Sequence, residues 1–235
     1  MNFLFKSESI DYEFFFNPNV DKTILFLHGW GGNKNSFITT IKLLKYKYNI
    51  LSLTMPTIQP TNEVWTLQDF CNLVLSILKI HNINSVSIIC HSFGFRIATI
   101  LKNFINIEKV VVTGGAGPKK ENLITRIKTQ NNKIILNKKR FKFLFTKIAS
   151  KEYFSLSNTN KVTFKNIVNF NTKKCLSFNC PILLFWGTRD TETKIWIAKL
   201  IKKYNHVKLI KTNSDHFAYL KLNSLFNHNV VEFFG

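Results

Sequence analysis

Short apolar runs alternate with longer amphipathic segments along most of this chain. Residues 23–27 (TILFL) and 85–90 (SVSIIC) are apolar runs of strand length, and neither contains a charge. Such runs are typical of strands that are covered on both faces. After most of them, apolar side chains recur every three or four residues, as in an amphipathic helix. Strands that alternate with helices form βαβ units, so the pattern predicts an α/β fold with a mainly parallel central sheet flanked by helices.

The same pattern gives approximate bounds for the elements. Strands are expected at 3–6 and 12–16 as an opening hairpin, and at 23–27, 48–53, 85–90, 109–113, 181–186 and 206–211. Helices are expected near 35–48, 66–78, 93–103, 192–204 and 217–226. Thr66 and Asp69 stand at the two positions of a capping box, which predicts that the second helix begins there.

The stretch 116–175 interrupts this alternation. It is too long for a simple connection and has no clear strand, so we expect an inserted helical cap between the two parts of a core, 1–115 and 176–235. The stretch carries 15 lysines and arginines against only Glu121 and Glu152, which is +13 of the total charge of +20. The predicted cap is therefore strongly basic.

Composition narrows the class of protein. With 235 residues, 45% of them hydrophobic, the chain can bury a substantial core, and no apolar stretch is long enough for an ordinary transmembrane helix. The charge of +20 favours an anionic partner, such as nucleic acid, an anionic lipid surface or an acidic protein. The 29 lysines against 4 arginines leave drift toward A/T-rich codons as the other explanation. No nucleic-acid recognition motif is present, so we do not expect a nucleic-acid binder.

The cysteines and the first residues bear on the compartment. Cys71, Cys90, Cys175 and Cys180 form neither a CxxC pair nor a zinc pattern, so we expect no metal site, and nothing calls for a cofactor. Acidic residues interrupt the apolar stretch 1–16, so we expect no signal peptide. Reduced thiols then indicate a cytoplasmic protein.

The first candidate for chemistry is Cys90-His91-Ser92-Phe93-Gly94, which follows a strand and opens a helix. This is the setting of a nucleophile elbow, G-x-S-x-G, in which a tight turn projects a serine from the end of a sheet. Cys90 replaces the first glycine and is small enough to fit. The other interpretation is an ordinary strand–helix turn.

The second candidate is His28-Gly29-Trp30-Gly31-Gly32, which follows an earlier strand. Acyl transfer needs backbone N–H donors at the position where an oxyanion forms. We expect these donors to be the N–H groups of Trp30 and Phe93. A phosphate loop is the alternative for a glycine-rich turn, but neither a P-loop nor a G-x-G-x-x-G spacing is present.

Asp190 and His216 each follow a later strand, within Trp186-Gly187-Thr188-Arg189-Asp190 and Ser214-Asp215-His216. A serine hydroxyl needs a base, and the base needs an orienting carboxylate. Ser92, Asp190 and His216 therefore occur in the order Ser…Asp…His, each past the carboxyl end of a strand, where the ends of parallel strands meet. Glu192 is the reserve acid.

Together these residues resemble the α/β-hydrolase superfamily over nearly the whole chain. HGWGG at 28–32 is similar to the oxyanion segment of small capped serine esterases, including carboxylesterases such as the pimeloyl-carrier-protein methyl esterases of biotin synthesis. The resemblance implies an α/β-hydrolase fold with Ser92 as nucleophile, His216 as general base and Asp190 as its orienting acid. Two departures affect the site's surroundings: TMPT at 54–57 replaces an Asp-x-Pro-Gly loop, and Phe95 stands where a second glycine often follows.

The predicted function is hydrolysis of a carboxylic ester, with an acyl-carrier-protein-linked methyl ester of the pimeloyl type as one substrate. A thioesterase, a C–C bond hydrolase with the same triad and a non-catalytic binding protein of this fold are the alternatives. An acidic carrier protein or an anionic lipid surface would fit the basic cap. Among the cap aromatics, Phe143 is the candidate for a substrate contact, with packing inside the cap as the other interpretation.

Overall fold

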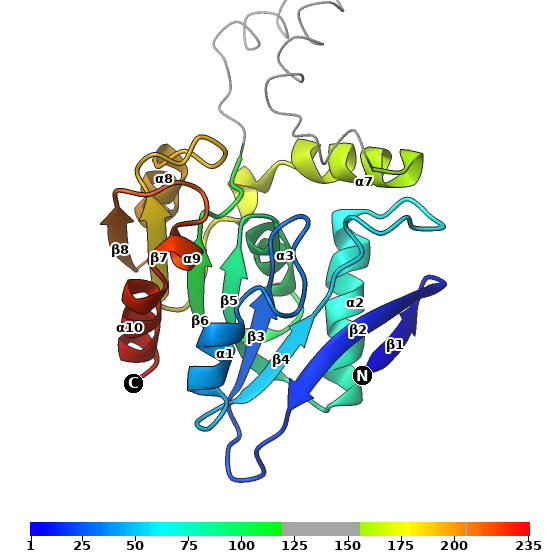
Figure 1. Ribbon diagram of the computed structural model, residues 1–235, viewed down its shortest axis with the longest axis horizontal. Helices are drawn as coiled ribbons and strands as arrows, with labels where there is room; N and C mark the ends of the chain where they lie inside the picture. The colour runs from blue at the N-terminus through cyan, green and yellow to red at the C-terminus, as the bar shows by residue number, and fades with distance from the viewer. Residues whose placement is uncertain (119–155, 205) are drawn as a thin grey trace, which may run out of the picture.

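The computed structural model describes residues 1–118, 156–204 and 206–235. In these residues one sheet has the strand order β1-β2-β4-β3-β5-β6-β7-β8 (Figure 1). The strands are β1 (Asn2–Phe5), β2 (Glu8–Phe15), β3 (Thr23–Leu27), β4 (Asn49–Leu53), β5 (Ser85–His91), β6 (Asn106–Thr113), β7 (Ile182–Gly187) and β8 (Val207–Thr212). The pairs β1–β2 and β2–β4 are antiparallel, and the remaining pairs are parallel. The predicted α/β architecture is confirmed.

Helices cover both faces of this sheet. They are α1 (Ile38–Leu44), α2 (Leu67–Ile80), α3 (Phe93–Leu101), α7 (Asn158–Asn169), the short 3₁₀ helix η1 (Thr172–Cys175), α8 (Trp196–Tyr204), α9 (Ala218–Lys221) and α10 (Asn223–Phe234). The helices α2, α3 and α8 pack on one face, and α1, α9 and α10 pack on the other. None of the helices described here is long and apolar enough to cross a membrane.

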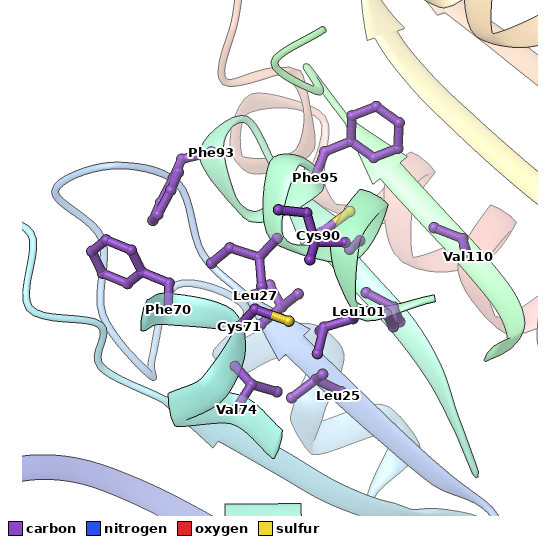
Figure 2. Close-up of a cluster of buried hydrophobic side chains, with 14 of the residues drawn as sticks. Leu25, Leu27, Phe70, Cys71, Val74, Cys90, Phe93, Phe95, Leu101 and Val110 are labelled. Atoms are coloured by element: carbon purple, nitrogen blue, oxygen red, sulfur yellow. The ribbon is translucent and has the colours of Figure 1, made fainter. Parts of the chain in front are cut away.

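Successive side chains of the central strands point alternately into two separate hydrophobic cores, one on each face of the sheet. On β3, Leu25 and Leu27 contribute to the core under α2 and α3, whereas Ile24 and Phe26 contribute to the core under α1 and α10. Figure 2 shows the first of these cores, where Leu25 and Leu27 lie among side chains of α2, such as Cys71 and Val74, and of α3, such as Leu101. This period of two explains why the central strands are apolar at every position.

Three of the predicted helices differ from the sequence-based bounds by three or more residues at an end. The first begins at Ile38 instead of residue 35. The helix α8 begins at Trp196 instead of residue 192, and the residues before it form a turn in which the Asp190 carboxylate accepts hydrogen bonds from the N–H groups of Glu192 and Thr193. The last segment breaks at Leu222 into α9 and α10 and continues to Phe234, which lets α10 bury its apolar side chains on the sheet. The capping box at Thr66 and Asp69 is confirmed.

A buried arginine ties the segment after β6 and the end of α7 to α3. The Arg96 guanidinium donates to the carbonyl of Gly117 at 2.9 Å and to that of Phe170 at 2.8 Å. Burial lowers the pKa of Arg96 to about 10, so the side chain stays charged at neutral pH. The two chain segments that border residues 119–155 are thus fixed to the helix that follows Ser92.

The carboxyl ends of the parallel strands meet at one edge of the sheet. In the register, Leu27 stands beside Cys90, His91 beside Thr113, and Gly187 beside Thr212. All four candidate segments leave the sheet at this edge, and α7 lies over it (Figure 1).

The close contact of α3 with β3 depends on the absence of a side chain at Gly94. A β-carbon there would lie 2.2 Å from the Leu27 carbonyl oxygen, and this backbone cannot move without disturbing the sheet. Gly94→Ala should therefore lower the free energy of unfolding by at least about 3 kcal/mol in urea denaturation. Gly117→Ala is the control, because the atoms nearest its β-carbon would belong to the side chain of Ile197 and not to backbone, so the loss should be smaller. Equal losses in the two variants would contradict this account.

Candidate active site

Ser92 occupies a tight turn between β5 and α3. Its backbone has φ +46° and ψ −110°, a conformation that a side-chain-bearing residue adopts only when its surroundings enforce it. The Ser92 N–H donates to the Thr113 carbonyl at 3.1 Å, and its carbonyl accepts from the Ala116 N–H at 3.0 Å. The turn is therefore held by the segment that follows β6, and the serine is left half-buried at the edge of the sheet.

Asp190 and His216 form a buried pair at the same edge. His216 Nδ1 lies 2.8 Å from Asp190 Oδ2, and both side chains are almost fully buried. The other carboxylate oxygen accepts from the N–H groups of Glu192 at 2.9 Å and Thr193 at 2.8 Å. Burial alone would raise the pKa of Asp190, but the hydrogen bonds from His216 and Thr193 outweigh it and hold the pKa below its ordinary value.

The loops after β7 and β8 bring these two residues together. Gly187 packs directly against the backbone of Ser214 and Asp215, where a β-carbon would lie within 2.4 Å of both carbonyl oxygens. The Arg189 N–H donates to the Ser214 carbonyl at 2.9 Å. The sequence predicted that Asp190 and His216 share an edge, and this backbone pairing places them in direct contact.

His216 lies close to the Ser92 turn. A β-carbon on Gly114 would lie 3.0 Å from His216 Nδ1, and Gly114 belongs to the segment that holds the Ser92 backbone. The rings of His216 and His91, the residue before Ser92, have centroids 4.6 Å apart. In the described part of the chain, however, Ser92 Oγ has no hydrogen-bond partner.

The second ring nitrogen of His216 faces Glu192. Its Nε2 lies 3.5 Å from Glu192 Oε2, and the Glu192 side chain is 59% exposed. Asp190 thus contacts Nδ1, and Glu192 lies on the opposite side of the ring. The sequence named Glu192 only as a reserve for Asp190, so its place beside Nε2 was not foreseen.

The loop 28–32 lies beside Ser92 and is braced by His28. The carbonyl of Gly29 lies 2.6 Å from His28 Nδ1 and accepts from the Gly32 N–H at 3.0 Å. Burial lowers the pKa of His28 to about 4, so the ring is neutral, donates from Nδ1 and accepts the Met55 N–H at Nε2. A β-carbon on Gly29 would lie 3.4 Å from Ser92 Cβ, which places this loop against the elbow.

Two backbone donors in this region have no partner. Among the described residues, neither the N–H of Trp30 nor that of Phe93 donates to another group. The Phe93 N–H is the first of α3, where the positive end of the helix dipole favours a negative charge. The Trp30 and Phe93 rings are in contact, with centroids 5.8 Å apart. Both predicted donors are therefore unpaired in the described residues, and the side chains of the two residues are in contact.

Thr193 also contacts the Asp190–His216 pair, and the sequence did not indicate this residue. Its hydroxyl lies 2.7 Å from Asp190 Oδ2, 2.9 Å from the Gly114 carbonyl and 3.1 Å from His216 Nδ1. It therefore connects the Asp190–His216 pair to the segment that holds Ser92. The only signal in the sequence is a threonine three residues after an aspartate, a spacing too common to single out.

The remaining candidates have simpler positions. Cys90 is fully buried with its Sγ 3.5 Å from the Val111 carbonyl, and burial raises the pKa of its thiol. Asp215 pairs with Lys221 at the surface. Phe143 lies outside the described residues. No group of histidine, cysteine, aspartate and glutamate side chains suited to a metal ion occurs in the ranges described.

The buried imidazole of His91 generates a pH prediction. Burial and the neighbouring His216 lower the pKa of His91 to about 3, from 6.5 in an unfolded chain. The unfolded state then binds more protons below pH 6.5, so stability falls as the pH is lowered from there toward 3. Between about pH 7 and pH 5 this residue should account for a loss of about 2 kcal/mol in the free energy of unfolding.

Urea denaturation across this pH range measures the effect. His91→Gln should flatten the decline, whereas His228→Gln, which alters an exposed histidine, should leave it unchanged. A decline of the same steepness in His91→Gln and in the unmodified chain would contradict the assignment.

Part of this chain is similar in sequence to a known bacterial hydrolase. No family model matches the chain. A stretch of 94 residues, 38% of the chain, is 29% identical to the uncharacterized hydrolase YugF of Bacillus subtilis, and it spans only 34% of that protein's length.

Solved structures match over almost the whole chain. An esterase from Exiguobacterium antarcticum superposes with a TM-score of 0.74 at 14% identity, covering 96% of this chain and 95% of the esterase. An α/β-hydrolase enzyme from a Medee basin deep-sea metagenome library gives 0.75 at 17% identity, covering 100% and 97%. A meta-cleavage product hydrolase from Pseudomonas fluorescens gives 0.69 at 14% identity, covering 100% and 97%. This chain has the α/β-hydrolase fold.

Proposed function

We propose that this protein is a serine hydrolase that cleaves carboxylic esters, with Ser92 as nucleophile, His216 as general base and Asp190 as its orienting acid. The observation that carries the proposal is the buried hydrogen bond between Asp190 and His216 next to the strained turn of Ser92. An ionised, buried carboxylate fixes the proton on Nδ1, which leaves Nε2 free to act as a base. The likeness to esterases in fold supports the same class of reaction.

The proposed reaction has two stages. Ser92 Oγ attacks the acyl carbonyl while its proton passes to His216 Nε2, and the carbonyl oxygen becomes an oxyanion bound by the N–H groups of Trp30 and Phe93. The C–O bond then breaks, and His216 returns the proton to the leaving alkoxide. Water, deprotonated by His216, attacks the acyl-enzyme and releases the acid and the free serine. For the first proton transfer, Nε2 must move from Glu192 toward Ser92 Oγ, a hydrogen bond that often tightens only with substrate bound.

The surroundings of the donors favour an apolar acyl group. The half-buried ring of Trp30 contacts both Phe93 and Phe164, a residue of α7, with centroids 5.8 Å and 5.0 Å apart. These three rings form an apolar cluster at the two residues that carry the N–H groups. A thioester, or a substrate with an activated C–C bond next to a carbonyl, could bind at the same site. Rates of hydrolysis measured with one substrate of each kind distinguish these reactions.

The positive charge of the predicted cap supports a second proposal, which concerns the molecule that carries the acyl group. The predicted cap carries +13, and a basic rim attracts an anionic partner before contact. An acidic acyl carrier protein bearing an acyl ester, such as a pimeloyl-type methyl ester, meets this requirement in the cytoplasm. An anionic lipid surface is the competing partner, and anionic vesicles represent it in the experiment that tests this proposal.

The triad proposal is tested with p-nitrophenyl esters of increasing chain length. Ser92→Ala should lower kcat by about four orders of magnitude or more, and Asp190→Asn by about three. Glu192→Gln is the matched control, because the Glu192 side chain is 59% exposed and its loss should lower kcat by less than about tenfold. If Glu192→Gln abolishes activity and Asp190→Asn keeps it, the acid assignment is wrong. Full activity in Ser92→Ala would overturn the proposed function.

The carrier proposal is tested by salt dependence. The rate constant kcat/KM for a carrier-bound ester should fall steeply as salt is raised, whereas that for a small neutral ester should not, because salt screens only the long-range attraction. Replacing Lys138, Lys139, Arg140 and Lys142 by alanine should weaken only the carrier-bound reaction. These four residues lie outside the described ranges.

A second quadruple variant removes the same charge elsewhere. Lys22, Lys42, Lys47 and Lys79 are exposed, and Lys22 and Lys47 precede β3 and β4, at the opposite edge of the sheet. Their replacement by alanine should leave the carrier-bound rate nearly unchanged. Equal losses in both variants would mean that overall charge alone is responsible. Stimulation by anionic vesicles but not by carrier protein would favour the lipid surface.

A further inference from the structure

The helix α7 is attached to the segment 57–61 chiefly by the buried amide of Asn160, and the Thr159 hydroxyl adds a hydrogen bond to the Thr61 carbonyl at 2.9 Å. Asn160 is 1% exposed, and its Nδ2 donates to the carbonyls of Thr57 at 3.2 Å and Gln59 at 2.7 Å. Its Oδ1 lies 3.3 Å from the Thr61 N–H and 2.8 Å from the Thr61 hydroxyl. All the hydrogen-bonding capacity of the side chain is thus directed at one short segment.

The same segment reaches the loop that carries Trp30. The Thr57 hydroxyl, 1% exposed, accepts from the Gly31 N–H at 3.1 Å. Gly31 has φ +79°, and its N–H belongs to the peptide unit that begins at the Trp30 carbonyl. The preceding peptide unit, which contains the Trp30 N–H, is held through the Gly29 carbonyl by His28 and Gly32. Thr57 therefore fixes the peptide unit after Trp30, whereas His28 and Gly32 fix the peptide unit before it.

A second contact from the same face of α7 meets Trp30 itself. Phe164 lies four residues after Asn160, which places both on one face of the helix. Its ring meets the Trp30 ring edge-on with centroids 5.0 Å apart. The Trp30 ring is thus in contact with α3 through Phe93 and with α7 through Phe164.

We propose that α7 sets the position of the Trp30 N–H through the path Asn160–Thr57–Gly31, which makes Asn160 and Thr57 positioning residues for oxyanion binding. This inference rests on the proposed function. A small shift of a backbone donor weakens its bond to the transition state more than it weakens ground-state binding, since the negative charge develops only in the transition state. Loss of the path should therefore lower kcat and leave KM for a small ester nearly unchanged.

The chain offers a control of the same kind. The Thr163 hydroxyl, also on α7, accepts from the Trp65 N–H at 2.9 Å and has no link to Gly31. Thr57→Val and Thr163→Val each remove one buried hydroxyl at nearly constant volume, and both should lower the melting temperature. Only Thr57→Val should lower kcat, by about 10- to 100-fold. Thr57→Ser, which keeps the acceptor, should restore the rate.

The test compares these variants in two measurements. A trifluoromethyl ketone that adds to the serine presents an oxyanion, so its affinity should fall in Thr57→Val by the same factor as kcat, while affinity for the product acid stays constant. Asn160→Asp, which loses both amide donors, should reproduce this loss, and the double variant should not double it, because both residues act on one element.

Two negative outcomes are distinguishable. If the unmodified chain hydrolyses esters but Thr57→Val and Asn160→Asp keep the kcat and ketone affinity of Thr163→Val, the path is merely structural and the inference is wrong. If the unmodified chain neither hydrolyses esters nor binds the ketone, the proposed function fails, and the inference falls with it.

Discussion

The positive φ of Ser92 is the constraint on which the rest of the site depends. A side-chain-bearing residue in this conformation costs about 1–3 kcal/mol, and two hydrogen bonds to the segment 113–116 help to offset that cost. The turn also requires α3 to lie so close to β3 that Gly94 touches the Leu27 carbonyl. All nine residues of α3 are buried as a result, which explains why this helix is apolar on nearly every side.

The same segment after β6 connects the parts of the site. The Thr113 carbonyl and the Ala116 N–H hold the Ser92 backbone. Gly114 packs against His216, and its carbonyl accepts a hydrogen bond from the Thr193 hydroxyl. Asp190, His216 and the elbow therefore share one support although they come from three different loops. Such backbone pairing keeps the Asp190–His216 pair out of water, and a hydrogen bond in a buried position is stronger than one at the surface.

The sequence predicted the features that depend on local pattern. The strand 23–27 and the capping box at Thr66 follow from apolar runs and from side-chain spacing, and both were correct. The contact of Asp190 with His216 was anticipated from parallel strand ends. Contacts between distant residues were not predictable: Asn160 and Thr57 are 103 positions apart, and nothing near either residue indicates the other.

The central claim is that the Asp190–His216 pair activates Ser92 as a nucleophile. Intact-mass measurement after treatment with a fluorophosphonate, followed by peptide mapping, tests it most directly. The account predicts a single phosphonyl adduct on Ser92 in the folded protein, and no adduct in folded His216→Ala at the same exposure. An unlabelled folded protein, an adduct on another residue, or undiminished labelling of His216→Ala would contradict it.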